Sequence, residues 1–149
     1  MCNNPNRRLQ NLQKEKELAP RLTLHRYYIW ANRMRTHFEE VLSRGVPVDE
    51  AQIESFLYMS YWYGALYVVI EGWRELKLSD TVIEQLLQSP NVGLLRRYRN
   101  GVFHFQKDYH DQKFIAFMQK GTDSVAWVRS LNLQFGRYFL SSSQPPEDV

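Results

Sequence analysis

The longest apolar run in the chain covers fifteen residues, FLYMSYWYGALYVVI (Phe56–Ile70), and contains no charged side chain. A membrane-spanning helix needs about twenty apolar residues, and this run is shorter and contains four tyrosines. We therefore expect no membrane partner. The run instead predicts a helix from about Glu50 to Leu76, capped by Asp49 and buried on nearly every side. Such a helix is either the centre of a bundle or half of a subunit interface.

The first half of the chain has the spacing of an amphipathic helix. Apolar residues recur at steps of three and four, which is the period of an α-helix and not of a strand. We expect this helix to begin near Pro20 and to end at Gly45 and Pro47. The residues expected to face the core are Leu24, Tyr27, Ala31, Met34, Phe38 and Val41.

The second half of the chain also has helical spacing, but in shorter segments. Ser79 and Asp111 are suited to cap two short helices. Another helix is expected from about Val92, and a last one from about Asp123. Their expected core positions are Leu95, Tyr98 and Val102 in the first of these two, and Val125, Val128, Leu131, Phe135 and Phe139 in the second.

These segments predict an all-α fold, an up-down bundle of four to five main helices. No segment alternates with the period of two that a strand requires. Residues 1–20 are polar and read as a flexible N-terminal arm, residues 21–140 as a single helical-bundle domain, and residues 141–149 as a disordered C-terminal tail.

Charge and cysteine content narrow the functional classes. Residues 1–37 carry a balance of +6, residues 38–90 one of −6, and residues 91–149 one of +3. These charges are either solvated faces that pair within the fold or a basic surface for RNA. Cys2 is the single cysteine, so no internal disulfide forms, and a cytoplasmic protein is expected. Glycine-rich phosphate loops, HExxH and cysteine pairs are missing from the sequence, so neither metal nor cofactor is expected.

The segment RRYRNGVFHF, residues 96–105, concentrates three arginines, an asparagine and a histidine in ten positions. Cleavage of RNA without a metal needs a group that accepts the 2′-hydroxyl proton and a fixed cation beside the phosphate. Histidine suits the first role because imidazole titrates near neutral pH. Arginine suits the second because its planar fork binds two phosphate oxygens. The other histidines, His25, His37 and His110, read as half-buried or surface residues.

Arg99, followed after four residues by His104 and directly by the polar Asn100, resembles the signature of the HEPN family (higher eukaryotes and prokaryotes nucleotide-binding). The resemblance implies a helical bundle and a metal-independent endoribonuclease with a toxin, phage-defence or RNA-processing role. It also implies a homodimer with the site in the cleft between protomers. His104 would be the acid/base, Arg99 the phosphate clamp and Asn100 an orienting amide. Residues expected to hold flanking phosphates of an RNA substrate are Arg96, Arg97 and Lys107.

Family members that pair with a nucleotidyltransferase antitoxin carry a tyrosine two residues after the histidine. This chain has Gln106 there. The resemblance therefore still implies an antitoxin or regulatory protein as a partner. It does not predict control by tyrosine modification.

Two alternatives to this site stay open. On an uninterrupted helix Arg99 lies about 140° from His104, whereas Arg97, Asn100 and His104 share one face. Arg97 thus competes with Arg99 as the partner of His104. Alternatively, Arg99 pairs with Glu71 or Glu75 and His104 is an interior histidine. The chain would then be a non-catalytic HEPN-like dimer, an interaction, nucleotide- or RNA-binding module.

Overall fold

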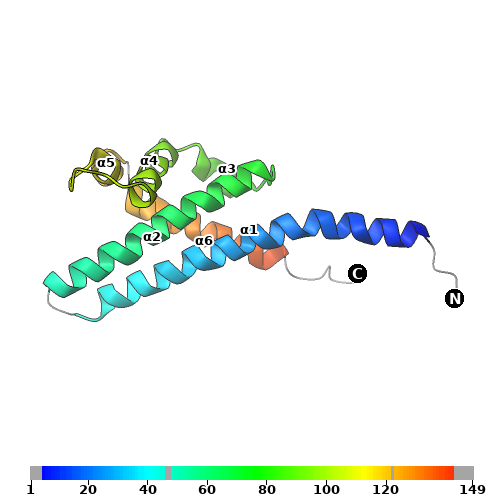
Figure 1. Cartoon of the computed structure of the whole chain (residues 1–149), viewed down its shortest axis with the longest axis horizontal. Helices are drawn as coiled ribbons and strands as arrows, with labels where there is room; N and C mark the ends of the chain where they lie inside the picture. The colour runs from blue at the N-terminus through cyan, green and yellow to red at the C-terminus, as the bar shows by residue number, and fades with distance from the viewer. Residues whose placement is uncertain (1–4, 46–47, 122, 143–149) are drawn as a thin grey trace.

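The structure, a computed structural model, describes residues 5–45, 48–121 and 123–142, and within these ranges it contains helices and no strand (Figure 1). The predicted all-α class is confirmed, and the six helices of these ranges correspond to the four long and two short segments expected. They are α1 (Pro5–Ser43), α2 (Val48–Glu75), α3 (Thr81–Leu87), α4 (Asn91–Phe103), α5 (Gln112–Lys120) and α6 (Ser124–Ser142).

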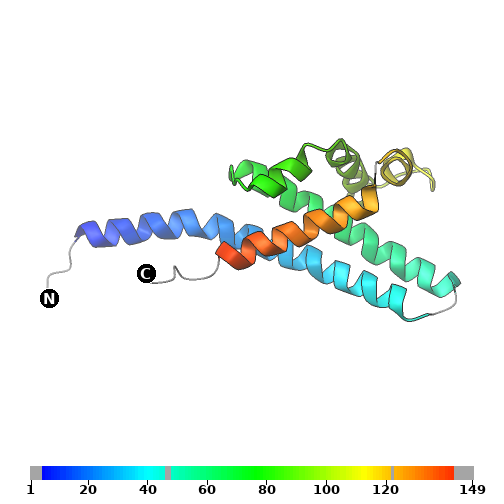
Figure 2. The ribbon, with the colours of Figure 1, turned by 180° about the vertical axis from the view of Figure 1, so that it is seen from behind.

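Helix α1 begins at Pro5, so the predicted start near Pro20 was wrong. Pro20 lies inside the helix, where it removes one backbone donor. The preceding residues are rich in Leu, Gln, Lys and Glu, which favour helix strongly enough to extend it. Residues 5–23 are all exposed and project from the rest of the molecule (Figures 1 and 2). The N-terminal arm is therefore helical from Pro5 onward.

Helices α1 and α2 form a long antiparallel pair (Figure 1). Four of the six residues expected to face the core are buried, namely Leu24, Ala31, Phe38 and Val41. Met34 is half-buried, and Tyr27 is exposed while its neighbour Tyr28 turns inward. The prediction for Tyr27 was wrong because α6 also packs on α1 and shifts the buried face toward Tyr28.

Helix α2 is central, with α1 on one side and α4 on another. Trp62, Leu66, Ile70 and Trp73 are almost fully buried, and burying each large apolar side chain contributes about 1.5–3 kcal/mol. The N-terminal part of the apolar run is less covered than expected, because Phe56, Leu57 and Tyr61 are about half exposed. α2 starts at Val48, so Asp49 lies within its first turn and not at the predicted cap position.

Two short helices show how local sequence sets helix starts. Asp111 caps α5 as predicted, since its carboxylate accepts from the Lys113 backbone N–H. For α3 the cap is Asp80 and not the predicted Ser79, because the Asp80 carboxylate accepts from Val82 and Ile83.

Helix α6 crosses α1 and α2 on the face seen in Figure 2. Its core residues are Trp127, Val128, Leu131, Phe135 and Phe139, whereas Val125, expected in the core, is exposed. Ser141 and Ser142, assigned to a disordered tail from sequence, belong to α6. The rest of that predicted tail, residues 143–149, lies outside the described residues.

Candidate functional site

The arginine–histidine motif occupies the last turns of α4 and the residue after it. The helix continues without interruption to Phe103, and the backbone N–H of His104 donates to the Asn100 carbonyl at 3.0 Å. Gly101 introduces no distortion. Its hydrogen faces α5, where an added Cβ would lie 3.1 Å from the Lys113 Cβ. The motif residues up to Phe103 therefore have regular helix geometry, whereas His104 has an extended backbone.

Arg99 turns toward α2 and forms an ion pair there. Its Nη2 donates to Oε1 of Glu71 at 2.9 Å, and its Cζ lies 5.0 Å from the centre of the Tyr67 ring. Tyr67 and Glu71 are one helical turn apart, so both meet the same guanidinium. The Arg99 Nε is buried and makes no hydrogen bond within the described residues. Of the two acidic partners weighed from sequence, Glu71 is the one in contact.

Arg97 and Asn100, three residues apart, share a different face of α4, and His104 follows the helix as its C-cap residue with an extended backbone. Arg97 and His104 are exposed and Asn100 is half-buried. No hydrogen bond of these three side chains occurs within the described part of the chain. Because His104 is exposed, its interpretation as an interior histidine was wrong. The structure thus directs Arg99 toward α2 and leaves Arg97 and His104 exposed to solvent.

The expected phosphate-contacting residues Arg96 and Lys107 are both exposed, as is Arg97. Arg96 lies on α4, and Lys107 lies in the segment between α4 and α5. Within the ranges that the structure covers, none of the three forms an ion pair. Their charges are therefore open to solvent.

Sequence reasoning missed the residues that hold the His104 backbone. Gln106 Nε2 donates to the His104 carbonyl at 2.6 Å, and Lys113 Nζ donates to Gln106 Oε1 at 2.8 Å. Gln106 was noted only as the replacement for a tyrosine, and its contact with a residue of α5 has no signature in sequence. Together they tie the segment after α4 to α5.

Exposed aromatic and aliphatic side chains border the motif. Phe103 is 49% exposed, and its ring contacts Tyr61 at a centroid distance of 6.0 Å. Tyr61 continues a row on α2 with Leu57 and Ile53, each one turn apart. We call these four residues, Ile53, Leu57, Tyr61 and Phe103, the α2–α4 apolar face. Neighbouring exposed apolar side chains of this kind are typical of an interaction surface.

The remaining histidines lie apart from this site. His25 stacks on Phe139 and His37 on Tyr58, and both are half-buried, as expected. His110 is exposed in the segment before α5. Over residues 5–45, 48–121 and 123–142, no group of three His, Cys, Asp or Glu side chains is placed to hold a metal ion. No helix in those same ranges combines the length and apolarity needed to cross a bilayer.

Comparisons with known proteins returned no matching family model, no matching curated protein and no matching solved structure.

Proposed function

We propose that this protein is a metal-independent endoribonuclease of HEPN type that acts as a homodimer. The observation that carries the proposal is the C-terminal end of α4, where Arg97 and His104 are exposed and Asn100 is half-buried. It combines an imidazole, a cation that is always charged and an amide. These are the groups that cleavage of a phosphodiester by the 2′-hydroxyl needs.

In the proposed reaction, an imidazole of His104 removes the 2′-hydroxyl proton as the 2′-oxygen bonds to the adjacent phosphorus. The bond from phosphorus to the 5′-oxygen breaks, and a second acid delivers a proton to that oxygen. The products are a 2′,3′-cyclic phosphate and a 5′-hydroxyl. A symmetry-related copy of His104 supplies the second acid, so the site needs two protomers.

The α2–α4 apolar face supports this dimer. Phe103 belongs to it and immediately precedes His104, so burying the face against its own copy draws two His104 side chains toward the two-fold axis. Arg96 and Lys107, both exposed, extend the positive charge along the RNA backbone.

Arg97 and Arg99 have different roles in this proposal. Arg97 is exposed and forms no ion pair within the described residues, so it serves as the phosphate clamp. Arg99 contacts Glu71 through Nη2, and its guanidinium lies over the Tyr67 ring. It is therefore a residue that positions α4 on α2. The amide of Asn100, one turn before His104, orients the reacting groups.

Cleavage of single-stranded RNA in EDTA by two arginine variants tests these roles. Arg97→Gln is expected to lower turnover at least about 100-fold, since one preorganised charge donor contributes about that much. Arg99→Gln is expected to lower thermal stability more than Arg97→Gln does. The proposal also requires 2′,3′-cyclic phosphate ends. Products with 3′-hydroxyl ends, or RNA that stays intact with the dimer present, would overturn it.

A second candidate function is a non-catalytic HEPN-like dimer that binds a partner or RNA. The contact of Arg99 with Glu71 and Tyr67 favours it, because the arginine of the motif then has a structural task. This module would keep the dimer and bind RNA in a salt-sensitive manner without producing cleaved ends.

A further inference from the structure

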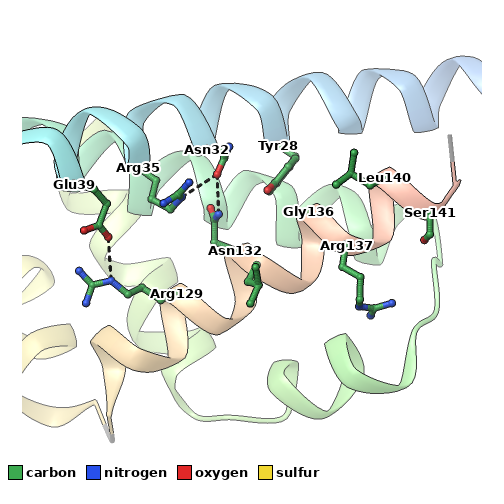
Figure 3. Close-up of a pocket in the computed structure, with 11 residues that line it drawn as sticks. Tyr28, Asn32, Arg35, Glu39, Arg129, Asn132, Gly136, Arg137, Leu140 and Ser141 are labelled. Atoms are coloured by element: carbon green, nitrogen blue, oxygen red, sulfur yellow. Dashed lines mark hydrogen bonds and ion pairs between the residues drawn. The ribbon is translucent and has the colours of Figure 1, made fainter. Parts of the chain in front are cut away.

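A groove of about 800 Å³ lies between α1 and α6, and no residue of the α4 motif lines it (Figure 3). Its volume is within the range of small-molecule sites in proteins. The lining combines charged, amide and apolar side chains from helices about a hundred residues apart in sequence. The proposed ribonuclease chemistry uses none of them.

A chain of three hydrogen bonds fixes Arg35 in this groove. Arg35 Nε donates to Asn32 Oδ1 at 2.9 Å, and Asn132 Nδ2 donates to the same oxygen at 3.0 Å. The Asn132 Oδ1 accepts from the Trp62 indole N–H at 3.0 Å. Asn132 is only 3% exposed, so the chain runs from the core to the groove. The anchored Nε leaves Nη1 and Nη2 of Arg35 with no hydrogen bond in the described part of the chain.

Positive charge exceeds negative charge along the lining. Arg129 donates through Nε to Oε1 of Glu39 at 3.1 Å, and its Nη groups make no hydrogen bond within the described ranges. A third arginine, Arg137, is paired with Asp80. Glu39 is the one carboxylate among the lining residues. The Nη donors of Arg35 and Arg129 are therefore both available within the lining, and the planar fork of a guanidinium matches a carboxylate or a phosphate.

The Tyr28 hydroxyl is a further donor in the groove. Burial raises the pKa of Tyr28, and the nearby Arg35 guanidinium offsets part of the rise. The phenol is thus protonated and able to donate at neutral pH. Gly136 makes room for it, since a Cβ there would lie 2.5 Å from the Tyr28 oxygen.

Beyond Arg129, α6 also contributes apolar side chains to the groove, beside the paired Arg137. Leu133 and Leu140 lie on α6 two turns apart and are 69% and 70% exposed. They are separated by about 10 Å along the helix axis. Arg129, Leu133, Gly136 and Leu140 follow at steps of three and four, so one face of α6 carries a cation at one end and leucines toward the other.

We propose that the groove between α1 and α6 binds a small amphipathic anion. The carboxylate or phosphate head is held by Arg35 and Arg129, and the alkyl chain lies along Leu133 and Leu140. The chemistry of the head, two or more anionic oxygens on one centre, is shared by fatty acids and alkyl phosphates. The proposal is independent of the ribonuclease function.

The test follows the Trp62 indole N–H by NMR, because it is bonded to Asn132 in the groove and a Trp62→Phe variant assigns its signal. The probes are octanoate, octyl phosphate, octanol and inorganic phosphate. Octanoate or octyl phosphate is expected to shift the signal in a saturable way, and comparison of the two identifies the preferred head. Octanol and inorganic phosphate, each lacking one half of the ligand, are expected to bind at least about ten-fold more weakly.

Three variants complete the test. Arg35→Gln is expected to weaken binding about ten-fold or more, and Leu133→Ser, at an exposed position that does not endanger folding, is expected to weaken the alkyl probes only. Arg33→Gln, an exposed arginine of the same helix outside the groove, is the control and is expected to change nothing. No shift with either anion, or equal weakening by Arg33→Gln and Arg35→Gln, would overturn the proposal.

Discussion

Arg99 donates to Glu71 at 2.9 Å across the α2–α4 contact, while the guanidinium lies over the Tyr67 ring. The Arg99 side chain is 22% exposed and that of Glu71 is 43% exposed. Solvent therefore screens the pair, and most of its value lies in the geometry that it imposes on α4. Arg99, the arginine that the family pattern pairs with His104, thus contacts α2.

Glu71→Gln is expected to lower the free energy of unfolding by about 0.5–1 kcal/mol, because it removes a partly screened pair. Arg99→Ala is expected to cost more, since it also removes the contact with Tyr67. Urea unfolding measures both. Glu75→Gln is the control, since Glu75 is exposed and unpaired within the described residues, and a cost equal to that of Glu71→Gln would contradict the structure.

Two glycines of α4 are expected to respond in opposite ways to alanine. At Gly93 no heavy atom lies within 4 Å of an added Cβ, so Gly93→Ala is expected to stabilise by about 0.5–1 kcal/mol through helix propensity. At Gly101 the Cβ would meet the Lys113 Cβ at 3.1 Å and Phe114 at 3.2 Å. Overpacking there is expected to destabilise by about 1 kcal/mol net. Thermal unfolding of the two variants gives the comparison, and equal stabilisation would show that α5 does not pack on Gly101.

The buried hydrogen bond between Ser60 Oγ and Tyr98 Oη, 2.9 Å long, predicts a coupled pair. Tyr98→Phe and Ser60→Ala are each expected to cost about 1–2 kcal/mol, because each leaves a buried hydroxyl without a partner. The double variant is expected to cost less than the sum of the two. Tyr109→Phe, at a residue 92% exposed, serves as the reference and is expected to be neutral. Strict additivity in urea unfolding would show that the two hydroxyls do not interact.

Asp80 links stability to pH. The hydrogen bond from Arg137, with the capping bonds from Ile83 and Val82, holds the pKa of its carboxyl below the ordinary value. The unfolded chain then binds the proton more readily, so the stabilisation is present above about pH 4 and is lost as pH falls through the lowered pKa.

Asp80→Asn keeps a capping side chain and removes the charge. It is expected to be less stable than the wild type at pH 7, and the difference is expected to vanish under strongly acidic conditions. Thermal unfolding across pH measures this. Asp108→Asn, at an exposed residue with no ion pair inside the described ranges, is the matched control. A difference between Asp80→Asn and wild type that stays constant with pH would contradict the assignment.

Much of the fold could be predicted because helix period and capping are local properties. The stripes around Phe38 and Leu131 and the cap at Asp111 follow from neighbours in sequence. The errors concern which side chains are buried and where a helix begins, and neighbouring residues alone do not determine these. Tyr27 and Val125 satisfy the helical period but lie at the edge of the buried face. Pro20 lies inside α1, although the apolar spacing predicted no helix before it.

The candidate site was predicted in the same uneven way. The sequence predicted the α4 segment and left either Arg97 or Arg99 as the partner of His104. Glu71 was one of the two acidic residues considered as partners of Arg99. Nothing in the sequence indicated the groove, because Asn32 and Asn132 meet from positions one hundred residues apart. Amide pairs of that kind leave no periodic signal.

The most direct test of the central proposal is turnover of single-stranded RNA in EDTA by wild type, His104→Ala and His110→Ala. Both histidines are exposed, and His110 lies in the segment between α4 and α5, so it controls for loss of a surface imidazole. The account predicts that wild type and His110→Ala cleave equally and that His104→Ala is slower by about 10²–10⁴-fold, the usual contribution of a general acid–base group. Equal cleavage by all three proteins, or cleavage by none of them, would contradict it.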